Sequence, residues 1–572
     1  MINLIFDNFS ILSNNFRRKL YIFFIFLSAT IFFESISIIF LFHSVNIFFN
    51  PADIDIDNNS LFMFFQFLGI NIIDKKHLIF SFIVILYLVK TSFLTFASWW
   101  QNSFLQNIRN NIGLRLYKKY MGKSHSYHVE KNSSEFIRNI TIDKDAFTFS
   151  ISQSMFLITE AMIVFFITII LMYFQPFVTF LLCSIFLTFS LVWYFLFKKK
   201  LTRWGKDRQF YDGKVFKFLN EGFTGHKEIQ ILGAEKFFIK NFNFNLFKST
   251  RAALYSNFIQ EMPRIWLEFL LIFSFAVIFI FLLVFKDSNT LIVVPLLAAY
   301  AGAALRLIPS INRVIVATNY LSYNKPVIKL FKSEFKTSNQ ENSLDELENK
   351  KIQFSNDIIF KDVNFSYQSS FDKIIRNFNY KIKKNEIIGI IGQSGSGKST
   401  IINLLMGVIA PNQGSILVDG ILLDNSNKRS WQGKIGYVPQ TIFLSDDSIK
   451  KNIALGKEKT EINSEKINKV VLDCQLFDFI SKLDNKEETR VGELGSKISE
   501  GQKQRLGLAR ALYKDPDILV LDEFTSSLDS ETEDEIMKII NNLKEKKTIF
   551  IVSHRDNPIK YCDKVINLDS LK

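Results

Sequence analysis

The segment GQSGSGKST, residues 392–400, has the residue types and spacing of a phosphate-binding loop, or P-loop. Glycines in such a loop let backbone N–H groups wrap phosphate oxygens at the N-terminus of a helix. Lys398 would supply a positive charge to the β- and γ-phosphates, and the Ser399 hydroxyl would ligate Mg²⁺. The apolar run EIIGII just before it predicts the strand that this motif requires. The candidate nucleotide-binding residues of the loop are Gly392, Gln393, Ser394, Gly395, Ser396, Gly397, Lys398, Ser399 and Thr400.

A second segment, DILVLDE, ends in the carboxylates Asp522 and Glu523. It predicts a buried strand that brings both groups to the phosphate end of a sheet. There Asp522 would hold Mg²⁺ through water, and Glu523 would polarise the attacking water. The alternative, an ordinary acidic strand end, is disfavoured by the P-loop upstream. His554 ends the apolar run IFIVSH, and this strand-end position favours contact with the γ-phosphate over the structural role usual for a lone histidine.

The chain around these residues has two halves of different composition, which divide near residue 335. The chain has 572 residues, 48% of them hydrophobic, and a formal net charge of +14. Before residue 335, six apolar stretches approach or exceed the ~20 residues that span a bilayer as a helix. They are residues 20–49, 77–100, 148–173, 177–197, 265–285 and 290–317. Basic loops follow the second and fourth stretches, whereas residues 49–76 are rich in Asp. The positive-inside rule therefore puts both termini and the two long loops in the cytoplasm.

The predicted fold class is a membrane all-α domain of six spanning helices, residues 1–335, followed by a soluble α/β P-loop NTPase domain, residues 351–572. The polar segment KTSNQENSLDELENKK predicts a linker at 336–350. Short apolar runs such as IIGIIG predict buried strands that alternate with helices. The excess of basic residues follows the membrane topology, which disfavours a nucleic-acid partner. The outer segment NNSLFMFFQFLGINII predicts either a short interfacial helix or a loop packed on its own domain.

The segment ISEGQKQRLGLARAL resembles the signature loop of ATP-binding cassette (ABC) proteins, whose usual form is LSGGQ. Gln440 in IGYVPQ resembles the Q-loop, Tyr367 in VNFSYQ the aromatic that stacks on adenine, and SSLD at 526–529 the D-loop. The resemblance implies ATP and Mg²⁺ as cofactors, with the metal near Ser399, Gln440 and Asp522, and Glu523, His554 and Gln440 as catalytic residues. It also implies that Ser499, Gly501 and Gln502 bind the γ-phosphate held by the P-loop of a second subunit.

One six-span half with one cassette resembles half of an ABC exporter. Because this family shares each ATP site between two cassettes, the resemblance implies a dimer. Heterodimeric exporters often carry one degraded site, whereas this chain keeps Lys398, Asp522, Glu523 and His554, which favours a homodimer. Glu500 departs from the family pattern, since a carboxylate beside a triphosphate is unfavourable unless it points away. We expect a competent site because Ser499 and Gly501 remain.

Two loop segments resemble the cytoplasmic coupling loops of such exporters. They are YMGKSHSYHVEKNSSEFIRNITIDKD and EGFTGHKEIQILGAEKFF, the second with a Gly-His-Lys-Glu run found in lipid A flippases. Taken as residues alone, they are mixed-charge helical segments that could equally be solvated surfaces. The location implied by the resemblance is the bacterial cytoplasmic (inner) membrane, with multiple spans and the nucleotide-binding domain in the cytoplasm.

Four basic residues in or beside the spans are candidates for substrate binding: Lys90, Arg264, Arg306 and Arg313. At 1.5 Å per residue, Arg306 lies roughly 22 Å and Arg313 roughly 33 Å inward from Leu291, and Lys90 lies about 20 Å inward from His77. An uncompensated midplane arginine costs ~2.5 kcal/mol or more, which favours a wet cavity or an acidic partner. The acidic candidates are Glu34, Glu261 and Glu268. For Arg264 and Arg313, a role as positive-inside anchors is the alternative.

The segments EMPRIWLEF and LRLIPSINRV resemble parts of the bacterial ABC flippase for lipid-linked oligosaccharides, and Lys90 stands where that relative has arginine. The resemblance implies ATP-driven flipping of an amphiphilic, anionic, lipid-linked glycan across the cytoplasmic membrane, with its pyrophosphate on these basic residues. One alternative is an exporter of another amphiphile, such as lipid A, a peptide or a hydrophobic drug. Another is an ABC ATPase that acts as a regulator or assembly protein. The residues do not identify the glycan, the lipid carrier or the pathway.

Overall fold

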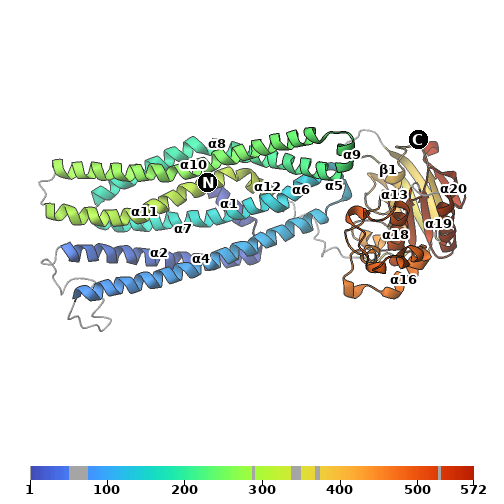
Figure 1. Ribbon diagram of the computed structural model, residues 1–572, viewed down its shortest axis with the longest axis horizontal. Coiled ribbons are helices and arrows are strands. Elements are labelled where there is room, and N and C mark those ends of the chain that lie inside the picture. The colour runs from blue at the N-terminus through green and yellow to red at the C-terminus, as the bar shows by residue number, and fades with distance from the viewer. Residues whose placement is uncertain are drawn as a thin grey trace. The chain divides into compact units, whose positions relative to one another are not determined.

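A computed structural model describes residues 2–49, 75–174, 176–285, 290–336, 350–367, 374–525 and 530–571 (Figure 1). The chain divides into two compact units. Unit 1 comprises Met1–Lys123 and His128–Asn342, and unit 2 comprises Ser124–Tyr127 and Ser343–Lys572. The predicted linker at 336–350, the outer segment NNSLFMFFQFLGINII and the D-loop at 526–529 lie wholly or almost wholly outside the described residues.

Unit 1 is helical in all of its described secondary structure. Its longest helices are α2 (Asn14–Phe49), α4 (Lys75–Met121), α7 (Lys144–Phe174), α8 (Pro176–Thr224), α10 (Glu235–Phe285) and α11 (Thr290–Tyr323). Its short helices are α1 (Ile2–Ser10), α6 (Ser133–Arg138), α9 (His226–Ile231) and α12 (Lys325–Lys336), and a π-helical turn joins α6 to α7. The short helix α5 (His125–Glu130) is divided between the two units. The six predicted spans fall one on each long helix.

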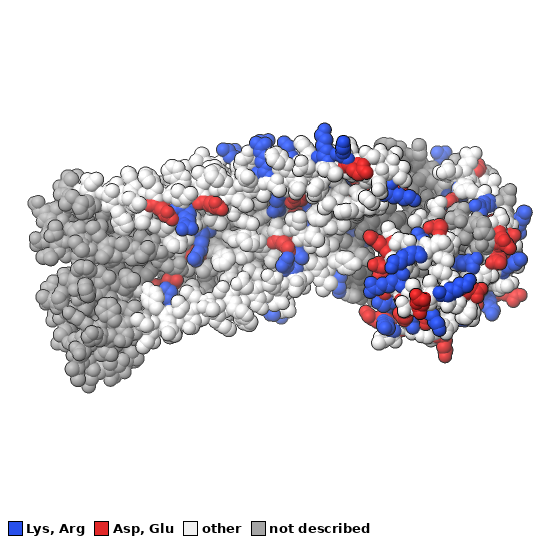
Figure 2. Space-filling view, viewed as in Figure 1, with Lys and Arg blue, Asp and Glu red and all other residues white. Residues whose placement is uncertain are grey.

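Three helical stretches in the described part of the chain are long and apolar enough to cross a membrane. They lie at Asn14–Ser37, Ser133–Tyr173 and Thr179–Thr224. The other three predicted spans lie on α4, α10 and α11, where some side chains fall outside the description. Many large apolar side chains of unit 1 point outward, including Phe165, Phe195 and Ile272. Figure 2 shows correspondingly broad uncharged areas over this unit. A surface of this kind suits a lipid solvent.

Close helix packing holds unit 1 together: α8 packs along α10, and α11 packs against α7 and α8. Gly205 on α8 shows how close the approach is, because a Cβ added there would lie 1.8 Å from the Tyr323 carbonyl oxygen of α11. Beside it, the Thr202 hydroxyl donates to the Ser322 carbonyl at 3.0 Å. A larger residue at position 205 would push these two helices apart.

Unit 2 is an α/β domain with two sheets. An antiparallel sheet has the order β2-β1-β4-β5, and a parallel sheet has the order β6-β7-β8-β3-β9. The strands are β1 (Asp357–Phe365), β2 (Ile375–Lys383), β3 (Ile387–Ile391), β4 (Gln413–Val418), β5 (Ile421–Leu422), β6 (Ile435–Val438), β7 (Ile518–Asp522), β8 (Thr548–Val552) and β9 (Lys564–Asn567). The helices are α13 (Lys398–Leu405), α14 (Lys428–Gln432), α15 (Ile449–Ile453), α16 (Ser464–Asp473), α17 (Phe477–Ser481), α18 (Glu500–Tyr513), α19 (Ser530–Leu543) and α20 (Asp556–Ile559), and several 3₁₀ turns complete the domain.

The parallel sheet is buried on both faces, which explains why its strands are continuous apolar runs in the sequence. Along β7, Leu519 and Leu521 join one hydrophobic cluster, whereas Ile518 and Val520 join the cluster on the other face. This alternation follows from the two-residue repeat of a strand. The buried sheet is a rigid base from which the loops at its carboxyl edge project.

Candidate active site

Four of the predicted functional segments leave the same edge of the parallel sheet. The P-loop follows β3, Gln440 follows β6, Asp522 and Glu523 end β7, and His554 follows β8. Strands β6, β7, β8 and β3 are consecutive neighbours in the sheet. In open α/β sheets, the carboxyl ends of the strands form the ligand-binding crevice. The fold therefore brings together residues that lie up to 162 positions apart in the chain.

The P-loop has the backbone that phosphate binding requires. Gly397 caps the N-terminus of α13 with φ +100°, a left-handed conformation that side chains oppose. The buried Lys398 ammonium donates to the carbonyl oxygens of Gly392 at 2.8 Å and Gln393 at 3.1 Å. The Ser396 hydroxyl is buried and has no hydrogen-bond partner among the described residues. A phosphate group fits this loop, because free N–H groups at a helix N-terminus and a nearby ammonium both favour an anion.

Glu523 lies between two polar side chains from the neighbouring strand ends. Gln440 Nε2 donates to Glu523 Oε2 at 2.7 Å, and His554 Nε2 lies 3.1 Å from Glu523 Oε1. Glu523 itself has φ +47°, and its backbone N–H donates to the Val552 carbonyl oxygen of β8. The carboxylate is thus held from both sides at the sheet edge, which is the arrangement expected of an oriented general base.

Asp522 has a different environment from its neighbour. The Tyr437 hydroxyl, from the end of β6, donates to Asp522 Oδ2 at 3.3 Å. Burial and the adjacent Glu523 carboxylate raise the pKa of Asp522, and the Tyr437 hydrogen bond and Lys398 oppose that rise. Burial and the Asp522 carboxylate raise the pKa of Tyr437, so the phenol remains a donor at neutral pH. Two carboxylates this close together favour a bound cation.

The residues around the edge fit Mg²⁺ bound together with a nucleotide. The Ser399 hydroxyl, the Gln440 amide and the Asp522 carboxylate offer the oxygen ligands that Mg²⁺ prefers. Within the described ranges, no group of three or more His, Cys, Asp or Glu side chains could hold a metal by itself. Mg²⁺ itself usually takes one or two protein ligands and completes its shell with substrate phosphates and water.

The signature segment begins helix α18 and is well ordered by its own contacts. The Ser499 hydroxyl accepts from the Gln502 N–H at 3.3 Å, and the Gln502 side chain accepts from the Ser499 N–H at 2.9 Å, forming a capping box. Glu500 Oε2 pairs with Lys503 Nζ at 3.3 Å on the same helix, which offsets its charge. Among the described residues, no hydrogen bond or ion pair joins this segment to the P-loop. Tyr367 packs edge-to-face on Phe365, 5.0 Å between ring centroids.

The predicted substrate-binding cations of unit 1 have carboxylate partners wherever their side chains are described. Lys90 Nζ lies 2.9 Å from Glu34 Oε2, and both side chains are at most 10% exposed. Arg313 Nη1 pairs with Glu160 Oε1 from α7, the arginine side chain being 53% exposed and the glutamate 4%. Arg264 pairs with Glu268 one turn along α10, and both are largely exposed. The Arg306 side chain lies outside the description.

Sequence reasoning missed two of these partners. Tyr437 precedes the recognised Gln440 by three residues and went unmarked, although its place near a strand end in IGYVPQ was a usable signal. Glu160, which holds Arg313, lies inside the apolar stretch 148–173. A carboxylate in a spanning segment is by itself an indication of function or of a basic partner.

The comparisons with known proteins agree with this architecture. Residues 20–305, half of the chain, match the ABC transporter transmembrane region, and residues 375–526 match the ABC transporter cassette. A probable ABC transporter ATP-binding/permease protein of Haemophilus influenzae is 31% identical over 63% of this chain and 64% of its own length. The chain thus spans slightly less than two thirds of that relative. An ATP-dependent lipid A-core flippase of Saccharophagus degradans is 26% identical over 85% of this chain and 82% of its own length.

The solved structure of a bacterial Atm1-family ABC exporter with ATP bound has the same fold. Its TM-score is 0.78 at 19% sequence identity, covering 98% of this chain and 95% of that chain. A helical membrane domain followed by a P-loop cassette defines a membrane transporter of the nucleotide-driven class. The chain belongs to the ABC transporter family. The predicted fold class is therefore confirmed.

Proposed function

We propose that this chain is one half of a dimeric exporter that hydrolyses ATP to flip an anionic, sugar-bearing lipid across the bacterial cytoplasmic membrane. The observation that carries the ATP part is the convergence of the P-loop, Asp522, Glu523, Gln440 and His554 at one sheet edge. The lipid part is supported by Arg313, a half-exposed guanidinium in an apolar helical unit, and by relatives named lipid A-core flippases that align over most of the chain.

In this proposal the P-loop residues, Gly392 to Thr400, bind the phosphates of ATP, and Tyr367 stacks on the adenine. Ser399, Gln440 and, through water, Asp522 would hold Mg²⁺, which would supply positive charge next to the phosphoryl group that is transferred. Glu523 orients and polarises the attacking water, and His554 keeps the Glu523 carboxylate in place. Tyr437 fixes the orientation of Asp522.

The signature segment supports the proposed dimer: among the described residues, Ser499, Gly501 and Gln502 make no hydrogen bond or ion pair with the P-loop of their own chain. We assign them to the ATP site of a second copy. The chain carries both a complete P-loop and a signature segment, so two identical chains would form two equivalent sites. The pairing of Glu500 with Lys503 on its own helix partly offsets the charge that would otherwise oppose a bound triphosphate.

Mixed dimers test this arrangement. We expect a heterodimer of Lys398→Ala and Ser499→Arg chains to hydrolyse ATP, since both defects fall in one shared site and the other site stays intact. A chain that carries both Lys398→Ala and Ser499→Arg, paired with the parent chain, should be inactive, because each shared site then has one defect. Purification through two different tags, followed by phosphate release, measures both. If each ATP site were formed within a single chain, the two dimers would show the reverse pattern of activities, and that result would contradict the proposal.

For the lipid, we place a phosphate on the free donors of Arg313, which presents one N–H to Glu160 and has others available. A lipid-linked oligosaccharide is our first candidate substrate. Lipid A is the second, favoured by the names of the relatives that align over 81–82% of their own length. Both combine phosphate, sugar hydroxyls and long apolar chains, so the same residues would serve either. We keep Arg264 and Arg306 as further phosphate contacts.

Reconstitution in liposomes tests the function. We expect ATP-dependent flipping of one of the two lipids, and an Arg313→Gln variant should lower its rate by about 10- to 100-fold, since a charged hydrogen bond is worth about 1.5–3 kcal/mol. Arg313→Lys should lose less. The double variant Arg313→Gln/Glu160→Gln controls for the carboxylate left unpaired. If neither lipid moves while ATP is hydrolysed, the lipid assignment is wrong.

A further inference from the structure

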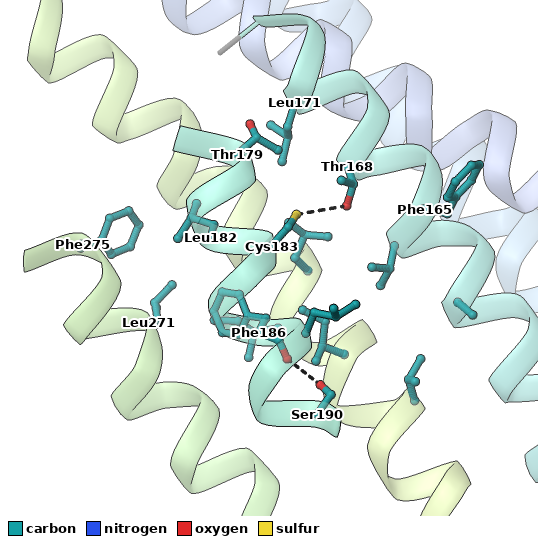
Figure 3. Close-up of a pocket in the computed structure, with 17 residues that line it drawn as sticks. Phe165, Thr168, Leu171, Thr179, Leu182, Cys183, Phe186, Ser190, Leu271 and Phe275 are labelled. Atoms are coloured by element: carbon teal, nitrogen blue, oxygen red, sulfur yellow. Dashed lines mark hydrogen bonds between the residues drawn. The ribbon is translucent and has the colours of Figure 1, made fainter. Parts of the chain in front are cut away.

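A cavity of about 400 Å³ lies within unit 1 between α7, α8, α10 and α11 (Figure 3). Its size is in the range of small-ligand pockets. Phe, Leu, Ile, Val and Ala side chains form most of the lining, as Leu171, Leu182 and Phe275 illustrate in Figure 3. Two of its polar groups are used within the protein. The Cys183 thiol contacts the Thr168 hydroxyl at 3.8 Å, and the Ser190 hydroxyl donates to the Phe186 carbonyl oxygen at 2.7 Å. The apolar length of the cavity lined by α7 and α8, called the shaft below, therefore suits an apolar occupant.

The cavity is elongated along α7. Its lining residues on that helix run from Ala161 to Leu171, which corresponds to roughly 15 Å of helix. Figure 3 shows Leu171 and Thr179 at one end, and Phe186 and Ser190 toward the other. A length of this kind, with apolar walls, matches a single hydrocarbon chain better than a compact ring system.

A charged pair is adjacent in sequence to residues at one end of the cavity, although neither of its members is in the lining. Glu160 precedes the lining residue Ala161, and Arg313 precedes the lining residue Val314. Glu160 Oε1 accepts from Arg313, but Glu160 Oε2 is buried and has no hydrogen-bond partner among the described residues. A buried carboxylate oxygen without a donor is unfavourable, and a ligand hydroxyl would satisfy it. The half-exposed Arg313 would accept a phosphate beside that hydroxyl.

We infer that this cavity binds one hydrocarbon tail of the transported lipid, with a phosphate at Arg313 and a head-group hydroxyl at Glu160. The inference rests on the proposed function and adds to it a tail site whose lining residues all come from one chain. The charged pair selects the head group, and the apolar shaft holds the tail. Glu160 and Arg313 are therefore specificity-determining residues rather than membrane anchors.

Photo-crosslinking of the full-length protein in nanodiscs tests the site. The probe is phosphatidylglycerol, which has a phosphate and free hydroxyls, with a diazirine near the end of one acyl chain. The matched control lipid is phosphatidylcholine with the same chain and no hydroxyls. We expect crosslinks from phosphatidylglycerol at residues 161–171 and 179–190, several-fold more abundant than those from phosphatidylcholine. Equal labelling by the two lipids, or crosslinks confined to other segments, would overturn the inference.

Two variants of equal bulk sharpen the result. Cys183→Trp fills the shaft and should remove the crosslinks, whereas Ser184→Trp, at an exposed neighbour outside the lining, should leave them unchanged. If Cys183→Trp does not fold, the native Cys183 supplies a second measurement. Phosphatidylglycerol should slow its alkylation by N-dodecylmaleimide, followed by mass spectrometry of that peptide, and phosphatidylcholine should not. Equal alkylation rates in both lipids would contradict the site.

The outcomes separate this inference from the proposed function. If a folded Cys183→Trp variant still flips lipid, the inferred tail site is wrong, but the proposed flippase function is not contradicted. If the protein crosslinks phosphatidylglycerol selectively but flips neither the lipid-linked oligosaccharide nor lipid A, the cavity is a lipid-binding site and the proposed flippase function is wrong.

Discussion

Replacing Glu523 with glutamine is expected to lower kcat for ATP hydrolysis by about 10²–10⁴-fold, the usual contribution of a general base. The amide cannot accept a proton from water, yet it has nearly the same shape and can still accept the hydrogen bond from Gln440. Glutamine also meets the same backbone demand at φ +47°. ATP binding should therefore survive, because the P-loop and Lys398 are untouched. Steady-state phosphate release and equilibrium binding of a fluorescent ATP analogue measure the two effects separately.

A matched control for this experiment is Glu545→Gln, which changes an exposed carboxylate that follows α19. We expect its kcat to equal that of the parent. A Glu523→Gln variant that retains more than a tenth of the parental kcat would show that another group activates the water, and a variant that loses ATP binding would show that Glu523 mainly holds the site together. Either result would require a different assignment for the end of β7.

The second large effect concerns the buried pair between Lys90 of α4 and Glu34 of α2. Lys90→Met removes the ammonium from beside the buried Glu34 carboxylate, and we expect a loss of stability of up to about 3–5 kcal/mol, the range for a broken buried ion pair. The double variant Lys90→Met/Glu34→Leu should recover most of it, because replacing both charges with apolar groups is often neutral or stabilising. The midpoint of thermal unfolding in detergent, followed by tryptophan fluorescence, measures the series.

The exposed pair of Lys217 and Glu221 provides the control. Lys217→Met removes a lysine from a surface ion pair, which is worth about 0–1 kcal/mol, so its unfolding midpoint should barely change. If Lys90→Met behaves like Lys217→Met, the buried pair does not stabilise the helical unit. The double variant also decides whether Lys90 binds substrate. A folded double variant that flips lipid at the parental rate assigns Lys90 to structure, and one that does not flip keeps it among the substrate contacts.

Much of the cassette was predictable from the sequence because phosphate binding depends on consecutive residues. The P-loop needs glycines at set positions in one turn, and the carboxylates Asp522 and Glu523 are adjacent in the chain. Continuous apolar runs also marked the buried parallel strands correctly, since a strand covered on both faces has no polar side. In motifs of this kind, the spacing of the residues along the chain determines their geometry.

The sequence made Glu34 and Glu268 candidate partners, but it could not predict in the same way which residue each charged group meets. Gln440 lies 83 positions from Glu523, Lys90 lies 56 from Glu34, and Arg313 lies 153 from Glu160. Spacing says nothing about such pairs, because they depend on which helices and strands become neighbours. For Arg313 the sequence left a wet cavity, an acidic partner or an anchor open, and the structure pairs it with Glu160 while leaving the guanidinium half exposed.

The sequence by itself thus determined the class of this protein: apolar stretches of bilayer length set the helical domain, and contiguous motifs set the cassette. Only the tertiary structure decided which charges are already paired, where an apolar cavity lies between α7, α8, α10 and α11, and which strand ends meet. The physical reason is the distance along the chain over which each property is determined. Hydrophobic length and loop geometry are local properties, whereas burial and ion pairing belong to the packed chain.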